Sequence, residues 1–168
     1  SGANNTTVGL QAGDAITTGA RNSAFGSTAL SSVTTGVDNT GVGHNAGVAL
    51  TTGNRNVALG SGSLVSDMAG NNNVAVGYNA MNASSGSDNT AVGSAALSTL
   101  ASGTRNVAIG TDALLTFDAD DNTAVGYHAS RSMINGVNNV SMGSYAMFSN
   151  INGTEGVALG AEALYLTT

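Results

Sequence analysis

The most regular feature of the chain is a nine-residue pattern in which large and small residues alternate. It reads Asn-(Thr/Val)-Ala-(Val/Ile/Leu)-Gly-x-x-Ala-(Leu/Met), with some substitutions, and it returns every 16 or 17 residues. Its glycine marks ten copies: Gly9, Gly26, Gly43, Gly60, Gly77, Gly93, Gly110, Gly126, Gly143 and Gly160. Alternation with a period of two is typical of a β-strand and not of a helix. Each repeat is therefore predicted to contain one short strand ending at its glycine.

A second apolar position follows most of these glycines by seven or eight residues and predicts a second strand. It is occupied by Ile16, Val33, Leu50, Met68, Leu100, Phe117, Ile134 and Ile151. A repeat of strand, turn, strand and turn is too short to bury its own apolar face, so neighbouring repeats must stack. We expect residues 1–168 to form one all-β domain, a parallel β-solenoid of about ten coils with 16–17 residues each.

Asparagine opens nine of the ten copies, and glycine does so only at Gly156. Asparagine tolerates left-handed backbone conformations, and stacked side-chain amides can form hydrogen bonds from coil to coil. The motif glycine has two readings, a positive φ angle at a corner or a close approach of two backbones. The sequence alone does not separate them.

The residue before each motif asparagine forms an ion column, in which basic and acidic residues tend to alternate. Its members are Asn4, Arg21, Asp38, Arg55, Asn72, Asp88, Arg105, Asp121, Asn138 and Glu155. Successive coils lie about 4.8 Å apart, so Arg21–Asp38–Arg55 and Asp88–Arg105–Asp121 should form ladders of opposite charge. A slipped coil would bring like charges together, so these ladders should fix the register.

Composition narrows the range of functions. The net charge is −6 with only four basic residues, which cannot supply the clustered cations that nucleic acid or an anionic membrane requires. Cysteine is absent, so disulfides and thiolate zinc sites are excluded. No apolar run approaches the length of a membrane span, and no membrane insertion is expected. The chain begins and ends within a repeat, and we expect it to be a piece of a longer fibre protein.

Candidate catalytic or metal-binding residues are few. His44 and His128 occupy different positions in their repeats, and two histidines without a third ligand give little support to a metal site. Asp118, Asp120 and Asp121 resemble the start of a calcium loop but lack its glycine and terminal glutamate. Exposed histidines and a solvated turn are the expected readings. We predict no enzymatic activity, no metal and no cofactor.

Three tyrosines stand one or two residues after a motif glycine: Tyr78, Tyr127 and Tyr145. An outward strip of aromatic rings would suit stacking against sugars and is the candidate surface-binding site. Ordinary packing between faces of the solenoid is the alternative.

The motifs resemble the head repeats of trimeric autotransporter adhesins. Residues 56–60 and 106–110 match their Asn-Val-Ala-(Leu/Ile)-Gly core, and the Asn-Thr-Ala-Val-Gly variant at 89–93 and 122–126 is more similar to repeats of phage tail fibres. The resemblance implies a left-handed β-roll, a homotrimer, and extracellular attachment from a bacterial surface or virion to a carbohydrate or protein receptor. It also implies that alanine and glycine fill a thin interior, while Val76, Val92, Ile109 and Val125 face the three-fold axis. The adhesin heads repeat in about fourteen residues, so the turns must be larger here.

The sequence leaves two other functions open. One is a monomeric solenoid that binds a regular surface such as ice through stacked threonines, but Thr6, Thr40, Thr90 and Thr123 are interspersed with valines. A phage depolymerase acting on polysaccharide would need paired carboxylates in a groove, whereas the acidic residues here are scattered or belong to the ion column.

Overall fold

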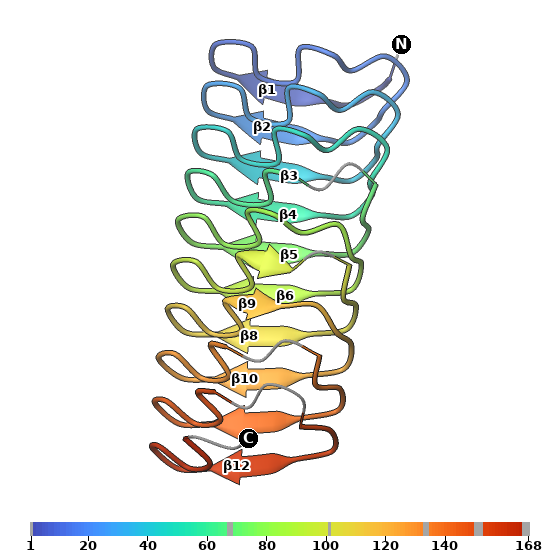
Figure 1. Cartoon of the computed structure of the whole chain (residues 1–168). Helices are drawn as coiled ribbons and strands as arrows, with labels where there is room; N and C mark the ends of the chain where they lie inside the picture. Colours follow the sequence, from blue (N-terminus) through green and yellow to red (C-terminus); the bar gives the residue numbers. More distant parts are fainter. Residues whose placement is uncertain (1, 67–68, 101, 133–134, 150–152, 166–168) are drawn as a thin grey trace.

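The chain winds into an elongated stack of coils (Figure 1). The computed structural model describes all residues except 1, 67–68, 101, 133–134, 150–152 and 166–168. Its described residues contain no helix and the following strands: β1 (Thr6–Val8), β2 (Ser23–Phe25), β3 (Thr40–Val42), β4 (Val57–Leu59), β5 (Val74–Val76), β6 (Thr90–Val92), β7 (Thr99–Leu100), β8 (Val107–Ile109), β9 (Thr116–Phe117), β10 (Thr123–Val125), β11 (Val140–Met142) and β12 (Val157–Leu159). The predicted all-β parallel solenoid is confirmed.

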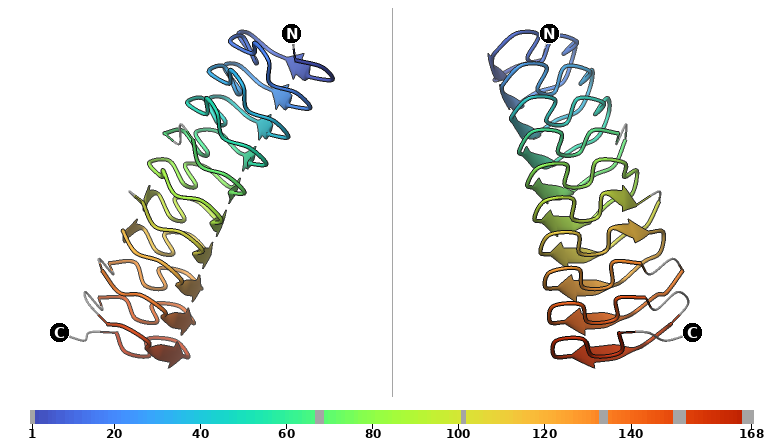
Figure 2. Two further views of the ribbon diagram at one scale, coloured as in Figure 1. Left: turned by 90° about the vertical axis from the view of Figure 1, so that its right-hand side faces the viewer. Right: turned by 60° about the vertical axis from the view of Figure 1, so that its left-hand side comes forward.

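Ten strands form one parallel sheet that runs the length of the stack, in the order β1-β2-β3-β4-β5-β6-β8-β10-β11-β12. Equivalent motif positions pair directly, as Ala58 does with Ala75 and Ala75 with Ala91. The strands of the main sheet point to the left in Figure 1, and the left panel of Figure 2 shows that they lie on the far side of that view. The chain returns on the near side and descends to the next coil, so the winding is left-handed. Each column of the repeat is therefore a vertical row on the molecule.

The prediction of a second strand in every repeat is wrong for most of the described repeats. Only β7 and β9 form at that position, and they pair as a separate two-stranded sheet. Val33 and Leu50 lie instead in turns, where they are fully buried. Ile16 packs against the core, and Met68, Ile134 and Ile151 lie outside the described residues. The physical reason is that the N–H groups of Ile16, Val33 and Leu50 donate to the carbonyl oxygen three residues earlier in their own coil, over 3.3, 3.3 and 3.1 Å. In β7, by contrast, the Thr99 N–H donates to Leu115 O of the next coil.

The interior is filled by alanine together with larger side chains. The central alanine of the strands and the alanine three positions after the glycine are buried throughout the core, as at Ala58, Ala75 and Ala80. Leu30, Leu64, Met81, Leu97, Leu114 and Met147 are also fully buried. The thin interior of alanine and glycine that the resemblance implies is therefore not found, because the motif glycine lies at a corner and the following Leu/Met column supplies the bulk of the core.

The motif asparagines form a buried amide ladder along the whole stack. The Asn56 N–H and Nδ2 donate to Asn39 Oδ1 over 2.9 and 3.1 Å, and the same Nδ2 donates to Gly70 O over 2.8 Å. Asn56 Oδ1 in turn accepts the Asn73 N–H at 2.9 Å. Both amide hydrogens and the oxygen are thus used, which a buried polar side chain requires. The ladder ends where the Gly156 N–H donates to Asn139 Oδ1.

The left-handed conformation belongs to the ion column and not to the asparagine that follows it. All ten members of the column have a positive φ, for example 62° at Asn4, 56° at Arg21 and 61° at Asp121. The sharp turn before each strand directs the next asparagine inward. The tolerance of asparagine for such turns therefore does not explain the motif asparagines, whereas amide stacking does.

Both readings of the motif glycine apply together. Gly93 has a φ of 138°, and a Cβ added to it would lie 2.5 Å from the carbonyl oxygen of Gly110 in the next coil. That distance is far below an ordinary contact, and the oxygen belongs to the backbone. Any other residue here would be strained and would also push two coils apart.

We predict that Asn56→Asp strongly destabilises the solenoid. The new carboxylate loses the two bonds donated by Nδ2 and would be charged inside the core, at a cost of about 3 kcal/mol in the free energy of unfolding. Burial raises the folded-state pKa of the new carboxyl above its unfolded value of about 3.9, so the deficit should be smallest in acid and grow as the pH rises through the raised pKa. Thermal unfolding followed by circular dichroism between pH 3 and pH 8 measures it.

Asn54→Asp is the matched control, because Asn54 is only partly buried and Asp120 already occupies the equivalent position two residues before a motif asparagine. The Asp120 carboxylate accepts the Thr104 N–H at 2.7 Å, so a carboxylate fits this column. Equal destabilisation by Asn54→Asp and Asn56→Asp would contradict the role assigned to the buried ladder.

Candidate functional site

The large apolar residues that end the strands of the main sheet point outward and form one continuous row, the outward row. The exposed fraction is 41% for Phe25, 43% for Leu59, 41% for Ile109 and 46% for Met142. The four residues predicted at a trimer axis lie side by side in this row, because Val76 pairs with Val92, Val92 with Ile109, and Ile109 with Val125. Val92 and Ile109 are exposed, while Val76 and Val125 are half-buried. A long apolar surface therefore remains on the outside of the sheet.

The ion column contains two bidentate ion pairs. Arg21 donates to both carboxylate oxygens of Asp38 at 2.5 and 2.7 Å, and Arg105 to those of Asp121 at 2.6 and 2.7 Å. Arg55 donates to Asn72 Oδ1 at 2.6 Å, and Asn72 Nδ2 donates to Asp88 Oδ1 at 2.8 Å. Each arginine reaches toward the following coil, so the ladder has a direction. The hydrogen bond from arginine lowers the pKa of Asp38 and of Asp121 below the usual range of a carboxyl group.

The acidic turn at residues 118–121 is tied to the preceding coil. Asp118 Oδ1 accepts the N–H and Oγ of Ser102, both at 2.9 Å, and Asp120 Oδ1 accepts the N–H of Thr104. Together with Asp121 in the ion column, all three carboxylates have partners in that coil. Within the described part of the chain, no group of three or more His, Asp or Glu side chains is placed to hold a metal ion.

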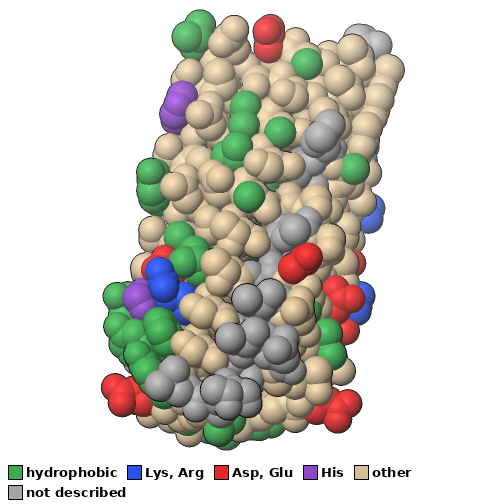
Figure 3. Space-filling model, in the orientation of Figure 1, with side chains coloured by type: hydrophobic (Ala, Val, Ile, Leu, Met, Phe, Trp, Pro, Cys, Tyr) green, Lys and Arg blue, Asp and Glu red, His purple; other side chains and the backbone are tan. Residues whose placement is uncertain are grey.

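Five rings gather at the corner after the last strands, and we call them the aromatic cluster: Tyr127, His128, Tyr145, Phe148 and Tyr165. Four of the rings lie nearly parallel to their neighbours. The centroids of Tyr127 and His128 are 3.7 Å apart at 18°, those of His128 and Phe148 6.1 Å at 25°, and those of Phe148 and Tyr165 5.1 Å at 8°. Tyr145 stands edge-on to Tyr127 and His128. Figure 3 shows hydrophobic side chains gathered with a histidine and a basic residue at the lower left of the molecule.

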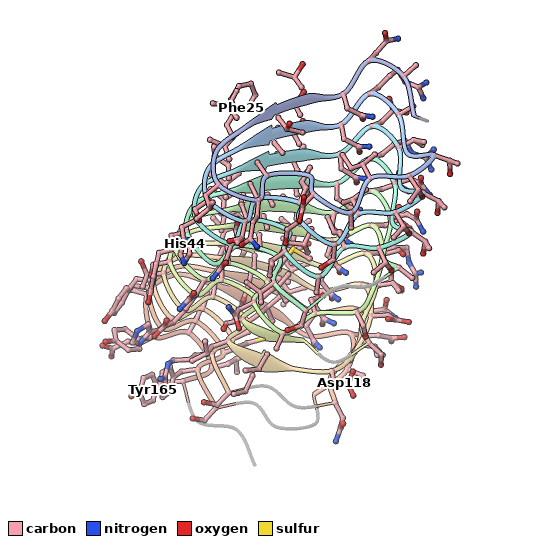
Figure 4. All side chains as sticks on the ribbon, turned by 90° about the horizontal axis from the view of Figure 1, so that it is seen from above. Phe25, His44, Asp118 and Tyr165 are labelled. Atoms are coloured by element: carbon pink, nitrogen blue, oxygen red, sulfur yellow. The ribbon has the colours of Figure 1, made fainter. Side chains whose placement is uncertain are left out.

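The predicted strip of three tyrosines is therefore realised only in part. Tyr127 and Tyr145 meet, with ring centroids 5.4 Å apart. Tyr78 follows β5 and Tyr127 follows β10, so two strands of the main sheet, β6 and β8, separate their coils. Tyr78 is 62% exposed. His44 is exposed as expected, and Figure 4 shows it on the same side of the stack as Tyr165, in a much earlier coil.

Polar groups border the aromatic cluster. Asp112 Oδ2 lies 3.2 Å from His128 Nε2 and 3.4 Å from Arg131 Nε. The His128 side chain is only 16% exposed, so its expected position on the open surface is wrong: neighbouring rings cover it. Burial raises the pKa of the Tyr145 phenol, and a hydrogen bond with Tyr127 raises it further. The site thus combines ring faces with a carboxylate, a guanidinium and an imidazole.

His128, Phe148 and Tyr165 were not singled out from the sequence as members of this site, although a signal for them exists. His128 and Tyr145 both stand two positions after the motif glycine, and Phe148 and Tyr165 both stand five positions after it. Aligning the repeats brings each pair into one column. Only the folded corner shows that the two columns are neighbours.

No protein-family model matches the sequence, and no curated protein or solved structure is significantly similar to it. The described residues also contain no helix that is long and apolar enough to cross a bilayer.

We predict that Arg105→Asp lowers the melting temperature by a few degrees, and more than Arg105→Asn does. The aspartate would place three acids in succession in the ion column with Asp88 and Asp121, whereas Asn72 already occupies this column between Arg55 and Asp88. Thermal unfolding at low and high salt measures the difference, which should shrink at high salt.

The stability that Arg105 gives to the parent protein, compared with Arg105→Asp, should depend on pH. Because Arg105 lowers the pKa of Asp121 in the folded state, the stabilisation is present above the unfolded value of about 3.9 and is lost as the pH falls through the lowered pKa. The gap between the parent protein and Arg105→Asp should therefore narrow below pH of about 4. A gap that stays constant from pH 7 into this range would contradict the ladder.

Proposed function

We propose that this chain is a structural and adhesive fibre segment, without catalytic activity, that assembles as a homotrimer and serves attachment from a bacterial surface or a virion. The observation that carries the proposal is the outward row. Ala58, Ala75 and Ala91 fill the inner side of the strands, so the larger residues on either side of each alanine must face out. A rigid rod with one continuous apolar row is suited to side-by-side association.

The size of this surface favours a permanent partner. Val57, Val74 and Val107 form a second, half-buried row beside the outward row. Together the two rows expose apolar area on the order of several hundred Å2, which is about the largest patch that soluble monomers usually tolerate. Copies of the same chain are suited to cover it, because rods with the same repeat place apolar residues opposite one another along their whole length.

The number of copies follows from symmetry and from the resemblance described above. A row on one side of a rod can be buried around a central axis, and a heterologous contact that closes into a ring leaves none of it exposed. The motifs at 56–60 and 106–110 resemble repeats of trimeric heads, which favours three copies over two. The placement of Val92 and Ile109 in the outward row is consistent with that assignment.

Ice binding receives less support. Thr40, Thr90 and Thr123 face outward at the first position of their strands, but Val57, Val74 and Val107 occupy the same row. A regular lattice of hydroxyl groups is therefore interrupted. A monomer with thermal hysteresis activity would favour this alternative.

We predict that Ile109→Asp converts a trimer into monomers that retain their β structure. The substitution places a charge in the middle of the outward row, where Ile109 pairs with Val92 and Val125, and burying three such charges at one axis would strongly oppose assembly. Light scattering coupled to size exclusion at micromolar concentration measures the mass, and circular dichroism measures the fold.

Ser94→Asp is the control, because Ser94 is exposed and lies at the corner two residues beyond Val92, outside the outward row. It should leave the trimer intact. A parent protein that is monomeric at this concentration, with full β structure, would refute the assembly and make the isolated solenoid the better description.

Methionine oxidation provides an independent test, because two described methionines differ sharply in their surroundings. Met142 lies in the outward row and is 46% exposed, whereas Met81 is fully buried in the core. In the assembled parent protein both should resist dilute peroxide, and in Ile109→Asp only Met142 should become reactive. Peptide mass spectrometry reads each site. Rapid oxidation of Met142 in the parent protein would show that the outward row is uncovered.

A further inference from the structure

The fold does not require aromatic residues at the positions of the aromatic cluster. The second position after the motif glycine, which we call the corner column, holds small or polar residues in the first six repeats: Gln11, Thr28, Asn45, Gly62, Asn79 and Ala95. The last repeats place His128 and Tyr145 there. The fifth position holds no ring in the first eight repeats, for example Ser31 and Ser98, but Phe148 and Tyr165 occupy it at the end. At these two positions, rings therefore occur only in the last three coils.

Tyr145 also opposes the local backbone preference. Every residue of the corner column has a positive φ, including 58° at Asn45, 56° at His128 and 57° at Tyr145. Asparagine, aspartate and histidine adopt this conformation more readily than tyrosine does. The column therefore holds a tyrosine at a position where the backbone favours other residues.

The polar groups of the site lie directly beside the rings. One carboxylate oxygen of Asp112, Oδ2, lies close to both His128 Nε2 and Arg131 Nε. Arg131 is the one arginine of the sequence that does not belong to the ion column. A carboxylate and a guanidinium beside ring faces offer both hydrogen-bond acceptors and donors, which is what adjacent hydroxyl groups of a sugar need. Tyr127 and Tyr165 remain 48% and 39% exposed, so parts of both rings are accessible.

We propose that the aromatic cluster, together with Asp112 and Arg131, binds an uncharged glycan. The apolar face of a hexose ring stacks on an exposed tyrosine ring, and its hydroxyl groups bond to the polar border. The net charge of −6 and the presence of Glu162 next in the corner column disfavour acidic sugars. The inference rests on the attachment role proposed above and gives that role a ligand class and a location.

The repeat supports an extended ligand rather than a single sugar. Coils follow one another at about 4.8 Å, and the residues of the cluster come from three successive coils after β10, β11 and β12. A glycan lying along the stack would therefore meet new rings at each coil. Because the chain contains no tryptophan and three of its four tyrosines lie in this cluster, tyrosine emission reports mainly on the proposed site.

The test uses the parent chain on a printed array of neutral and acidic oligosaccharides, followed by saturation-transfer NMR and tyrosine emission with the neutral oligosaccharides that bind. Two variants remove the rings by using residues that the same columns contain elsewhere: Tyr127→Ser, as at Ser61, and Tyr145→Asn, as at Asn79. Each should keep the fold and weaken binding by about tenfold, as loss of one stacking contact implies. Saturation transfer should be largest for the protons on the apolar face of the sugar ring.

Tyr78→Ser is the matched control. Tyr78 stands at the same position of its repeat as Tyr127 and is more exposed, but it lies in a distant coil. The Tyr78→Ser variant should bind neutral glycans with the same affinity as the parent protein. Absence of binding to every neutral glycan on the array, binding of acidic glycans alone, or equal loss in Tyr78→Ser and Tyr127→Ser would each overturn the proposal.

The Ile109→Asp monomer separates this inference from the proposed assembly. Ile109 lies on the sheet, whereas the aromatic cluster lies at the corner that follows the strands. A monomeric variant that still gives saturation transfer from a neutral glycan supports the site whatever the oligomeric state. A parent trimer that binds no neutral glycan overturns the site while leaving the fibre assembly in place.

Discussion

The coil-to-coil bonding of the buried motif asparagines is the interaction on which the rest of the structure depends. Asn39, Asn56 and Asn73 each accept from the next amide and donate to the previous one, and all three are fully buried. An amide in this position is satisfied only if the coils before and after it lie in one register, because its hydrogen-bond partners belong to both. The ladder therefore imposes one register on the whole stack. The motif glycines are the steric counterpart, since their carbonyl groups approach the neighbouring glycines too closely for a side chain.

Once the interior is fixed in this way, the outer columns are free to differ from coil to coil. The ion column shows this freedom within limits: every member is left-handed, yet it holds arginine, aspartate, asparagine and glutamate. Arg21 and Arg105 donate hydrogen bonds to aspartates of the next coil, while Arg55 donates to an asparagine. The column thus adds complementarity to a register that the asparagines already set. The corner column varies more widely, and the aromatic cluster arises there without any change in the interior.

Much of this architecture could be predicted from the sequence, because the repeat encodes it directly. The strands at Val57–Leu59 and Val107–Ile109 follow from alternation, and the ladders follow from the repeat length. The second strands were predicted wrongly because the N–H groups of Val33 and Leu50 close turns within their own coil instead of pairing with the next coil, and the residue types at these positions carry no signal for that choice. The aromatic cluster was found only in part for a similar reason. Tyr145 and Phe148 are three residues apart, but their contacts with His128 and Tyr165 depend on how two columns meet at a corner.

The two surfaces of the molecule support different tasks because they belong to different parts of the coil. The outward row lies on the sheet, and Figure 4 shows Phe25 there, while Tyr165 lies at another edge of the stack. The proposed assembly would bury the outward row and leave the corners accessible. Each copy of the fibre would then present its aromatic cluster at the same height, so that an extended or clustered glycan could contact several at once. Linked weak sites gain affinity from their effective concentration, and a single stacking site of modest affinity would then be sufficient for attachment. The regular interior thus makes the apolar row continuous, and in the proposed assembly it would set the ring clusters in register from chain to chain.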